Sequence, residues 1–170
     1  MISSRRHSVL HDTPVGTLTL VAVGDCLVGV WMEDQRHHPG TVAHGVPADP
    51  GDPFLAGVAD QLEEYFAGRR TAFEIPVAPA GTDFQRRVWA ELQRIPFGET
   101  LSYGQLAQRL GSPGGSRAVG LANGRNPVGI VIPCHRVVGS AGSLTGYGGG
   151  LERKRLLLDL ESRVAGHHLF

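Results

Sequence analysis

"IPCHRVVGS" spans Ile132 to Ser140 and contains Cys134, one of two cysteines in the 170-residue chain. A thiol is a good nucleophile once it is a thiolate, and a neighbouring imidazole is a common means of forming one. On a regular strand, the side chains of Cys134 and His135 would point to opposite faces. The pair can therefore act together only if the backbone turns here or a water bridges the two groups.

By itself, a Cys-His dipeptide more often marks a buried structural cysteine beside an exposed histidine. Pro133 restricts the residue before it and is typical of a place where a strand ends. The other cysteine, Cys26, lies in an alternating apolar segment, and we predict that it belongs to the core. Two cysteines make no disulfide framework, which favours free thiols in a reducing compartment.

The sequence on both sides of Cys134 predicts mostly helices. Thr82 with Gln85 and Ser102 with Gln105 form capping-box patterns, each before a helical segment. Residues 116–127 predict a third helix, and the glycine-containing turn before it makes a helix-turn-helix candidate. We expect a short buried strand over 128–132, a flexible loop over 140–150 and a final amphipathic helix from residue 151.

The N-terminal half predicts an antiparallel meander followed by one helix. Residues 17–23 and 26–32 are rich in β-branched residues and bounded by turn signals. Residues 33–52 show no periodicity and predict a loop, 53–69 have helical spacing, and 71–77 favour one more strand. We therefore expect an α/β (α+β) chain with domains at 1–77 and 82–170, joined by a linker at 78–81.

Charge is divided unevenly along a chain whose formal net charge is zero. Residues 1–83 carry 5 Arg/Lys and 11 Asp/Glu, whereas residues 84–170 carry 11 and 5. Such an asymmetry favours a polyanionic partner for the basic half, or two halves that complement each other at their interface. The N-terminal residues lack the apolar stretch of a signal peptide, and no run has membrane-spanning length, which predicts a cytoplasmic protein without a membrane partner.

The string "IPCHRVV", preceded by "RAVGLANGRNPV" and followed by "TGYGGG", resembles the O6-alkylguanine-DNA alkyltransferases. The resemblance covers about residues 82–161, while the N-terminal half is similar only in its strand-helix layout. It implies a ribonuclease H-like N-terminal domain and a winged helix-turn-helix-like C-terminal domain. It also implies a methyltransferase that repairs O6-alkylguanine, and O4-alkylthymine, in double-stranded DNA in one turnover.

The resemblance also implies roles for individual residues. Cys134 would accept the alkyl group, His135 would act as base through a bridging water, and Glu161 would orient His135. The Tyr103 hydroxyl would lie at guanine N3, and Asn126 would brace the turn before the cysteine. The base pocket would include the carbonyls of Cys134 and Val137, the Gly148 amide and Tyr147.

The same family enters DNA through the minor groove, which is about 6 Å wide, and flips the damaged base out. Arg117 would fill the vacated stack. Small residues along the third helix, including Ala118 and Ala122, would allow the close approach, and Tyr103, Ser112 and Ser140 would contact the DNA backbone. Arg125 and Arg136 are weaker candidates for phosphate contacts. The implied protein is a monomer, with clustering on DNA left open.

No cofactor or metal is implied. Gly146–Gly150 lacks the lysine of a phosphate-binding loop, and His37, His38 and Cys26 have no recognisable ligand spacing. Three other functions remain to be weighed: a helix-turn-helix transcription factor, a cysteine hydrolase, and an alkyltransferase-like sensor that binds lesions without repairing them. The first leaves the Pro-Cys-His-Arg string unexplained, the second requires turnover, and the third lacks the cysteine.

Overall fold

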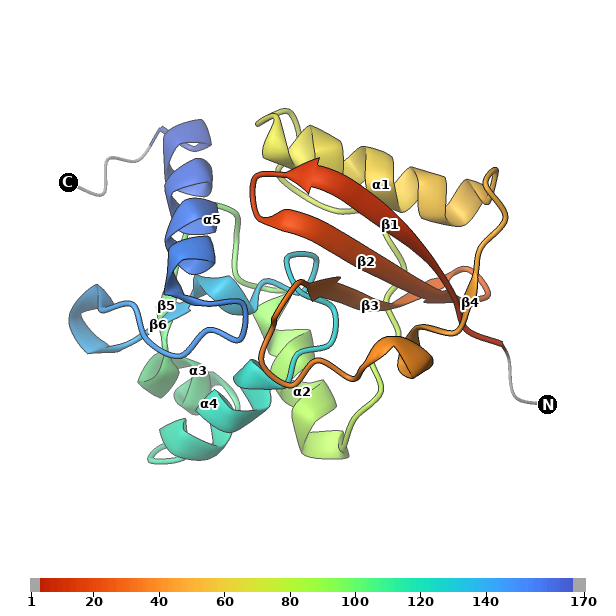
Figure 1. The fold of residues 1–170 in the computed structure, drawn as a ribbon. Helices are drawn as coiled ribbons and strands as arrows, with labels where there is room; N and C mark the ends of the chain where they lie inside the picture. The colour runs from red at the N-terminus through yellow and green to blue at the C-terminus, as the bar shows by residue number, and fades with distance from the viewer. Residues whose placement is uncertain (1–3, 167–170) are drawn as a thin grey trace.

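The alternating segments of the N-terminal half form one sheet in the computed structural model, which describes residues 4–166 (Figure 1). Three strands pair as the predicted antiparallel meander: β1 (Arg6–Thr13), β2 (Gly16–Val23) and β3 (Cys26–Met32). Along β2, Leu18, Leu20 and Ala22 are buried, as the two-residue period of a strand requires when one face meets a core. Cys26, predicted as a core residue, is only half-buried at the beginning of β3.

The loop predicted over 33–52 contains two short elements that the sequence did not indicate. A 3₁₀ turn, η1, covers Thr41–His44, and β4 (Val46–Pro47) pairs in parallel with β1, so that the sheet has the order β3-β2-β1-β4. Both are too short to give a periodic signal. Residues 71–77 form no strand. Instead, Val77 makes an isolated bridge to Leu27, with the backbone amide of Leu27 donating to Pro76 at 2.8 Å.

Helix α1 (Pro53–Phe66) packs against β1 and β2 (Figure 1). Asp52 caps it by accepting a hydrogen bond from the Leu55 amide at 3.0 Å, and Pro53 occupies the first turn, where its missing N–H costs nothing. Its buried stripe consists of Leu55, Val58, Leu62 and Tyr65. The stripe brings Tyr65 to the end of α1 that lies nearest the C-terminal half.

The helices of the C-terminal half begin where the capping boxes predict. Both boxes are formed reciprocally, Thr82 with Gln85 and Ser102 with Gln105, at the starts of α2 (Asp83–Leu92) and α3 (Tyr103–Arg109). Helix α4 (Ser116–Gly124) contacts both α2 and α3. The short strands β5 (Leu101–Ser102) and β6 (Val137–Val138) pair in parallel beside them, and α5 (Leu151–Val164) ends the described fold.

The strand predicted over 128–132 is wrong. This apolar run is buried but follows an irregular course, in which Ile130 has a φ of +71°, a left-handed conformation that a β-branched residue rarely adopts. The Ile132 amide donates to the Val128 carbonyl at 2.9 Å, which closes the turn. Periodicity alone cannot separate such a buried turn from a buried strand.

Buried apolar residues of both halves belong to one cluster. It runs from Leu20 of the sheet through Leu62 of α1 to Val88 of α2 and Leu157 of α5. The two halves on either side of the predicted linker therefore share one core, and the domain boundaries themselves remain a prediction.

Candidate active site

The backbone turns at Cys134. Residues Cys134–Arg136 form a single 3₁₀ turn, η2, which begins after Pro133 and leads into β6. The Cys134 amide donates to the Ile132 carbonyl at 2.8 Å, and the Arg136 amide donates to the Pro133 carbonyl at 3.0 Å. Because Cys134 and His135 lie in a turn, their side chains need not point to opposite faces as they would on a regular strand.

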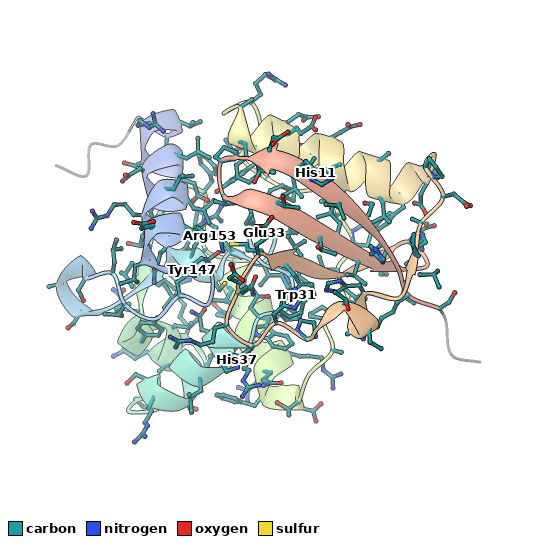
Figure 2. The ribbon with its side chains drawn as sticks, viewed as in Figure 1. His11, Trp31, Glu33, His37, Tyr147 and Arg153 are labelled. Atoms are coloured by element: carbon teal, nitrogen blue, oxygen red, sulfur yellow. The ribbon has the colours of Figure 1, made fainter. Side chains whose placement is uncertain are left out.

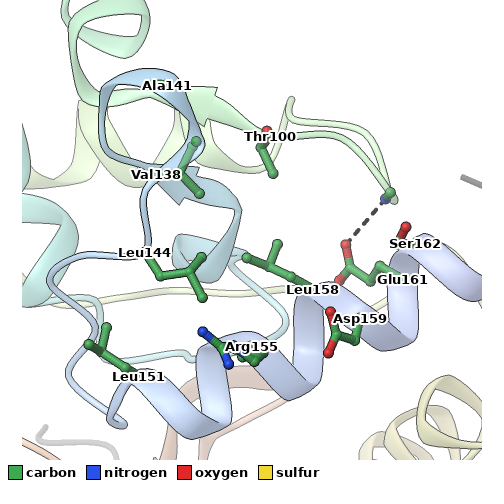
Figure 3. A pocket seen from close by; sticks show the side chains of 12 residues that line it. Thr100, Val138, Ala141, Leu144, Leu151, Arg155, Leu158, Asp159, Glu161 and Ser162 are labelled. Atoms are coloured by element: carbon green, nitrogen blue, oxygen red, sulfur yellow. Dashed lines mark hydrogen bonds between the residues drawn. The ribbon is translucent and has the colours of Figure 1, made fainter. Parts of the chain in front are cut away.

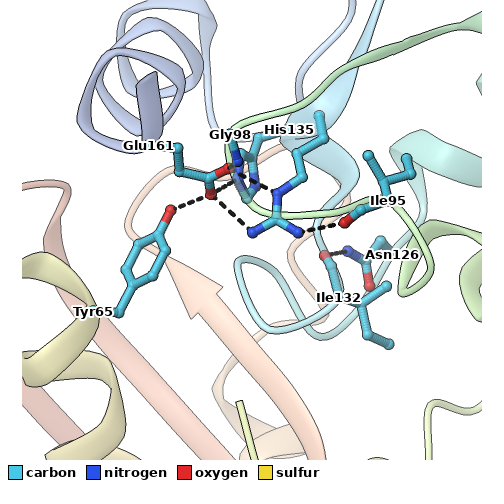
Figure 4. Close-up of polar contacts among 8 residues, drawn as sticks. Tyr65, Ile95, Gly98, Asn126, Ile132, His135 and Glu161 are labelled. Atoms are coloured by element: carbon cyan, nitrogen blue, oxygen red, sulfur yellow. Dashed lines mark hydrogen bonds and ion pairs between the residues drawn. The ribbon is translucent and has the colours of Figure 1, made fainter. Parts of the chain in front are cut away.

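His135 is fully buried and contacts the carboxylate that the resemblance assigns to it. Its Nε2 lies 2.6 Å from Glu161 Oε2, although 26 residues separate the two in sequence (Figure 4). The carboxylate of Glu161, on α5, also accepts from Arg136 Nε at 2.8 Å and from the Gly98 amide at 3.2 Å. The hydroxyl of Tyr65, on α1, also donates to Glu161 Oε2, at 2.6 Å.

Arg136 is not available for a phosphate contact, and that prediction is wrong. The side chain is buried and donates from Nε and Nη2 to Glu161, and from Nη1 to the Ile95 carbonyl at 2.7 Å. Its guanidinium also lies over the ring of Phe97, 5.7 Å from the centroid. Arg136 therefore neutralises the buried carboxylate and ties it to the segment after α2.

The contacts of Glu161 determine its ionisation. Burial alone would raise the pKa of the Glu161 carboxyl, but His135 and Arg136 beside it hold that pKa well below its usual range. Burial lowers the pKa of His135 despite the opposing effect of Glu161, which favours the neutral imidazole. Since Nε2 faces a carboxylate, Nε2 carries the proton of the neutral ring, and Nδ1 keeps its lone pair.

Nδ1 of His135 is buried, and no group within residues 4–166 hydrogen-bonds to it. Burial also raises the pKa of the Cys134 thiol, with Asn126 and Lys154 acting against the shift. The site therefore combines a thiol that stays protonated at neutral pH with an unused basic nitrogen on the next residue. Such a thiol needs a base at the moment of reaction.

The cavity at Cys134 is small. Its volume is about 10 Å³, close to the room one water molecule needs, and its walls include Gln35, Asn123, Tyr147 and Gly148. The segment after β3 covers part of it, because Gln35 is one of its walls and the Arg36 amide donates to the Gly148 carbonyl at 2.8 Å. Nearby, Arg153 of α5 donates to the Glu33 carbonyl at 2.7 Å, and Figure 2 shows these two residues beside Tyr147.

Asn126 spans the turn that leads to the cysteine. Its Nδ2 donates to the Ile132 carbonyl at 2.7 Å, and its Oδ1 accepts from the Val128 amide at 3.0 Å (Figure 4). Asn123, one turn earlier, donates to the Cys134 carbonyl at 3.4 Å. The Cys134 carbonyl, predicted to hold the base's amine, is thus already in use by one donor, although a carbonyl oxygen has a second lone pair.

Lys154 is a buried member of the site that sequence reasoning missed. Its ammonium donates to the Val137 carbonyl and, at 2.8 Å, to the Thr145 carbonyl, and burial lowers its pKa to about 8. It ties β6 to the glycine-rich loop. In the sequence it appears as one charge among several in "LERKR", and helical periodicity does not distinguish it from its exposed neighbours.

The remaining predicted residues lie on both sides of this loop. The Tyr103 hydroxyl donates to the Thr145 and Gly146 carbonyls, at 3.1 and 3.3 Å, and its half-buried position raises its pKa. Arg117 and Ala118 are exposed on α4, and Ser140 is exposed at η3 (Ser140–Gly142), while Ser112 is half-buried. Ala122 lies on the buried side of α4. Its contact with DNA stays a prediction, and the burial of its side chain does not favour that contact.

A larger cleft of about 590 Å³ lies along α5, with Glu161 and Ser162 among its lining residues (Figure 3). Leu144, Leu151 and Leu158 form much of its apolar wall, with Arg155 and Asp159 at its polar side. Cys134 lines the 10 Å³ cavity and not this cleft, so the candidate active site is the smaller one. Within the described part of the chain, no helix is both long and apolar enough to cross a membrane.

Two protein-family descriptions match almost the whole chain. Residues 7–79 match "6-O-methylguanine DNA methyltransferase, ribonuclease-like domain", and residues 83–163 match "6-O-methylguanine DNA methyltransferase, DNA binding domain". The N-terminal half, which resembled the family only in layout, thus matches it by sequence as well.

Individual relatives agree with these matches. The methylated-DNA–protein-cysteine methyltransferase of Mycobacterium bovis is 53% identical over 154 residues, 91% of each chain. The crystal structure of Mycobacterium tuberculosis O6-methylguanine methyltransferase superposes with a TM-score of 0.84 at 50% identity, covering 94% of this chain and 93% of that one. A structure of the Mycobacterium tuberculosis protein in complex with DNA gives 0.87 at 49%, covering 94% of both.

The buried carboxylate predicts a pH-dependent loss of stability in Glu161→Gln. Removing the charge leaves Arg136 buried without its partner, which should lower the free energy of unfolding by about 3–5 kcal/mol at pH 7. Because its folded pKa is depressed, Glu161 stabilises the fold above its unfolded pKa of about 4.5, and this contribution is lost as pH falls further. Urea unfolding from pH 3 to 7 should therefore show the two proteins converging in acid.

Glu99→Gln, which neutralises an exposed carboxylate, is the matched control and should change the free energy of unfolding by no more than about 0.5 kcal/mol. A difference between wild type and Glu161→Gln that stays constant from pH 7 to pH 3 would contradict this view of the carboxylate.

Proposed function

Since the chain belongs to the 6-O-methylguanine DNA methyltransferase family and repairs DNA by alkyl transfer, we propose that Cys134 is the acceptor and that each molecule reacts once. The observation that carries the proposal is the line of contacts from Glu161 through His135, whose unused Nδ1 belongs to the residue next to Cys134. The thiol and the base are buried in η2, and Glu161, which orients the base, is buried beside them on α5.

The proton moves first. His135 takes the thiol proton of Cys134 at Nδ1, through one water, while Glu161 holds the Nε2–H and stabilises the imidazolium that forms. The thiolate then attacks the alkyl carbon. A bond forms between Sγ and that carbon, the bond from the carbon to guanine O6 breaks, and its electron pair stays on the guanine.

The leaving guanine must gain a proton or a strong hydrogen bond. The Tyr103 hydroxyl is a candidate donor, because its raised pKa keeps it protonated and it lies at the glycine-rich loop beside the cavity. To reach the base it would exchange the Thr145 and Gly146 carbonyls for guanine N3. If Tyr103 gives up its proton, the imidazolium of His135 must replace it, so that overall the proton of the thiol ends on guanine. The protein keeps the alkyl group as a thioether.

The thioether makes the reaction stoichiometric. A thioether sulfur is a poor leaving group, and the chemistry described here supplies no step that restores the thiol. The same pocket would accept O4-alkylthymine, whose alkyl group is also carried by an exocyclic oxygen next to a ring nitrogen.

Access to Cys134 requires changes in both partners. The reacting atom of a paired guanine lies inside the duplex, so the nucleotide must be flipped out at a cost of a few kcal/mol. A cavity of about 10 Å³ is far too small for a base, so the segments that line it must also move apart. Helix α4 presents Arg117 and Ala118 to solvent, and we infer that this side of the helix enters the minor groove, with Arg117 replacing the flipped base.

Stoichiometric methylation is the first expected result. Incubation with duplex DNA that contains O6-methylguanine should raise the intact mass by one methylene equivalent, about 14 Da, and peptide mapping should place it on Cys134. Transfer should stop at one equivalent per chain, and Cys134→Ser should gain no mass. Sustained turnover with excess DNA would contradict the proposal and favour a hydrolase.

A second prediction separates base flipping from chemistry. Arg117→Ala should slow repair of duplex DNA at least about 10-fold, because unstacking the base costs a few kcal/mol and the arginine offsets part of that cost. Reaction with free O6-benzylguanine, which needs no flipping, should keep its rate. Arg70→Ala, which removes a charge from the N-terminal half, is the control for net charge. Equal slowing of Arg117→Ala on both substrates would show that Arg117 fills no vacated stack.

A further inference from the structure

The N-terminal half contributes a side chain to the charged network of the C-terminal half. Tyr65, at the end of α1, donates its hydroxyl proton to Glu161 Oε2 at 2.6 Å, across 96 residues of sequence. The tyrosine is 1% exposed. Figure 4 shows its hydroxyl approaching the carboxylate from the side opposite the backbone of η2.

Tyr65 and His135 use the same oxygen. Oε2 lies 2.6 Å from His135 Nε2 and 2.6 Å from the Tyr65 hydroxyl, and it also accepts from Arg136 Nη2 at 3.1 Å. Oε1 accepts from Arg136 Nε and the Gly98 amide. A donor on a carboxylate oxygen withdraws negative charge from it. The strength of the Tyr65 hydrogen bond therefore changes the potential that His135 experiences, and also fixes where Oε2 stands.

The hydroxyl is not needed for packing. Its ring lies against Phe66 and Phe73, each at a centroid distance of 5.4 Å, and against Phe97 at 6.1 Å. A phenylalanine would fill this aromatic cage equally well, and a hydroxyl in such surroundings costs free energy unless it is hydrogen-bonded. Burial, with Glu161 adding to it, raises the pKa of Tyr65 well above its usual value, which keeps the group a proton donor at every pH of interest.

We propose that Tyr65 is a positioning residue for alkyl transfer, whose hydroxyl holds the Glu161 oxygen that orients His135 and so tunes the base that activates Cys134. This inference rests on the proposed function. It also gives the N-terminal half a part in the chemistry, since α1 supplies one of the donors on that oxygen, beside those from His135 and Arg136.

The other charged or titratable groups around His135 come from α5, from its own turn and from α1. Glu161 and Lys154 face it from α5, Arg136 and Cys134 belong to its own turn, and Tyr65 acts from α1 through Oε2. Removing the Tyr65 hydroxyl leaves the other four in place. Oε2 then becomes more negative and stabilises the imidazolium, so His135 should remain protonated to a higher pH.

The test is the rate of alkyl transfer from free O6-benzylguanine to the full chain, measured from pH 5 to 9. In Tyr65→Phe, the acid limb of the profile should move about 0.5–1 pH unit upward, and the plateau rate should fall about 2-fold to 10-fold, as expected for one lost hydrogen bond. Phe73→Leu is the control, because it loosens the same aromatic cage but keeps the hydroxyl. Its acid limb should coincide with that of wild type.

A second variant keeps the test decisive if Tyr65→Phe does not fold. Replacing Tyr65 with 3-fluorotyrosine nearly preserves its volume and strengthens the donor, so the acid limb should move in the opposite direction, to lower pH. Superimposable limbs for wild type and the Tyr65 variants, or a shift of equal size in Phe73→Leu, would overturn the inference. Failure of wild type to alkylate Cys134 would instead overturn the proposed function.

Discussion

The ionised carboxylate of Glu161 is the constraint on which the rest of the site depends. A charge with 1% exposure is tolerated only if donors surround it, and these come from α1, from the segment after α2 and from η2. Donors from both halves of the chain therefore converge on the two oxygens of this carboxylate. Loss of any one donor would leave a buried charge partly unpaired, which costs free energy. The carboxylate therefore fixes the relative positions of Tyr65, His135 and Arg136 more closely than apolar packing would.

From this constraint the chemistry follows in order. The carboxylate holds the Nε2–H of His135, which leaves Nδ1 as the basic nitrogen, and burial keeps both the imidazole and the Cys134 thiol neutral at rest. A buried thiol in so small a cavity is shielded from oxidation and from unintended alkylation. Under the proposed function, it would react once the cavity opens to a flipped base and His135 can accept its proton.

Local patterns in the sequence predicted much of the fold. The capping boxes at Thr82 and Ser102 define helix starts through contacts between residues three apart, and the alternation of Leu18, Leu20 and Ala22 in β2 reflects the face that meets the core. The strand assigned to 128–132 was wrong because an apolar run is buried equally well in a turn, here closed by contacts that involve Asn126. Strand β4 is too short to leave a pattern at all.

The site was predicted only where a motif carries it. Cys134 and His135 are adjacent in a specific string, and the family resemblance supplied Glu161. Tyr65 and Lys154 gave no signal, because each occupies an ordinary helical position whose partner is far away in sequence. Arg136 was a candidate for phosphate contacts because the sequence does not distinguish a buried arginine from an exposed one in a basic half. Only the structure shows its burial beside Glu161.

The tautomer of His135 tests the central claim most directly. In the full chain labelled with ¹⁵N-histidine, NMR at pH 7 should show a neutral imidazole with the proton on Nε2 and an unprotonated Nδ1. Glu161→Gln should broaden or shift these resonances, while the exposed-site variant Glu99→Gln should not. A proton on Nδ1, or an imidazolium at pH 7, would contradict the account, because His135 would then have no free lone pair to accept the proton of Cys134.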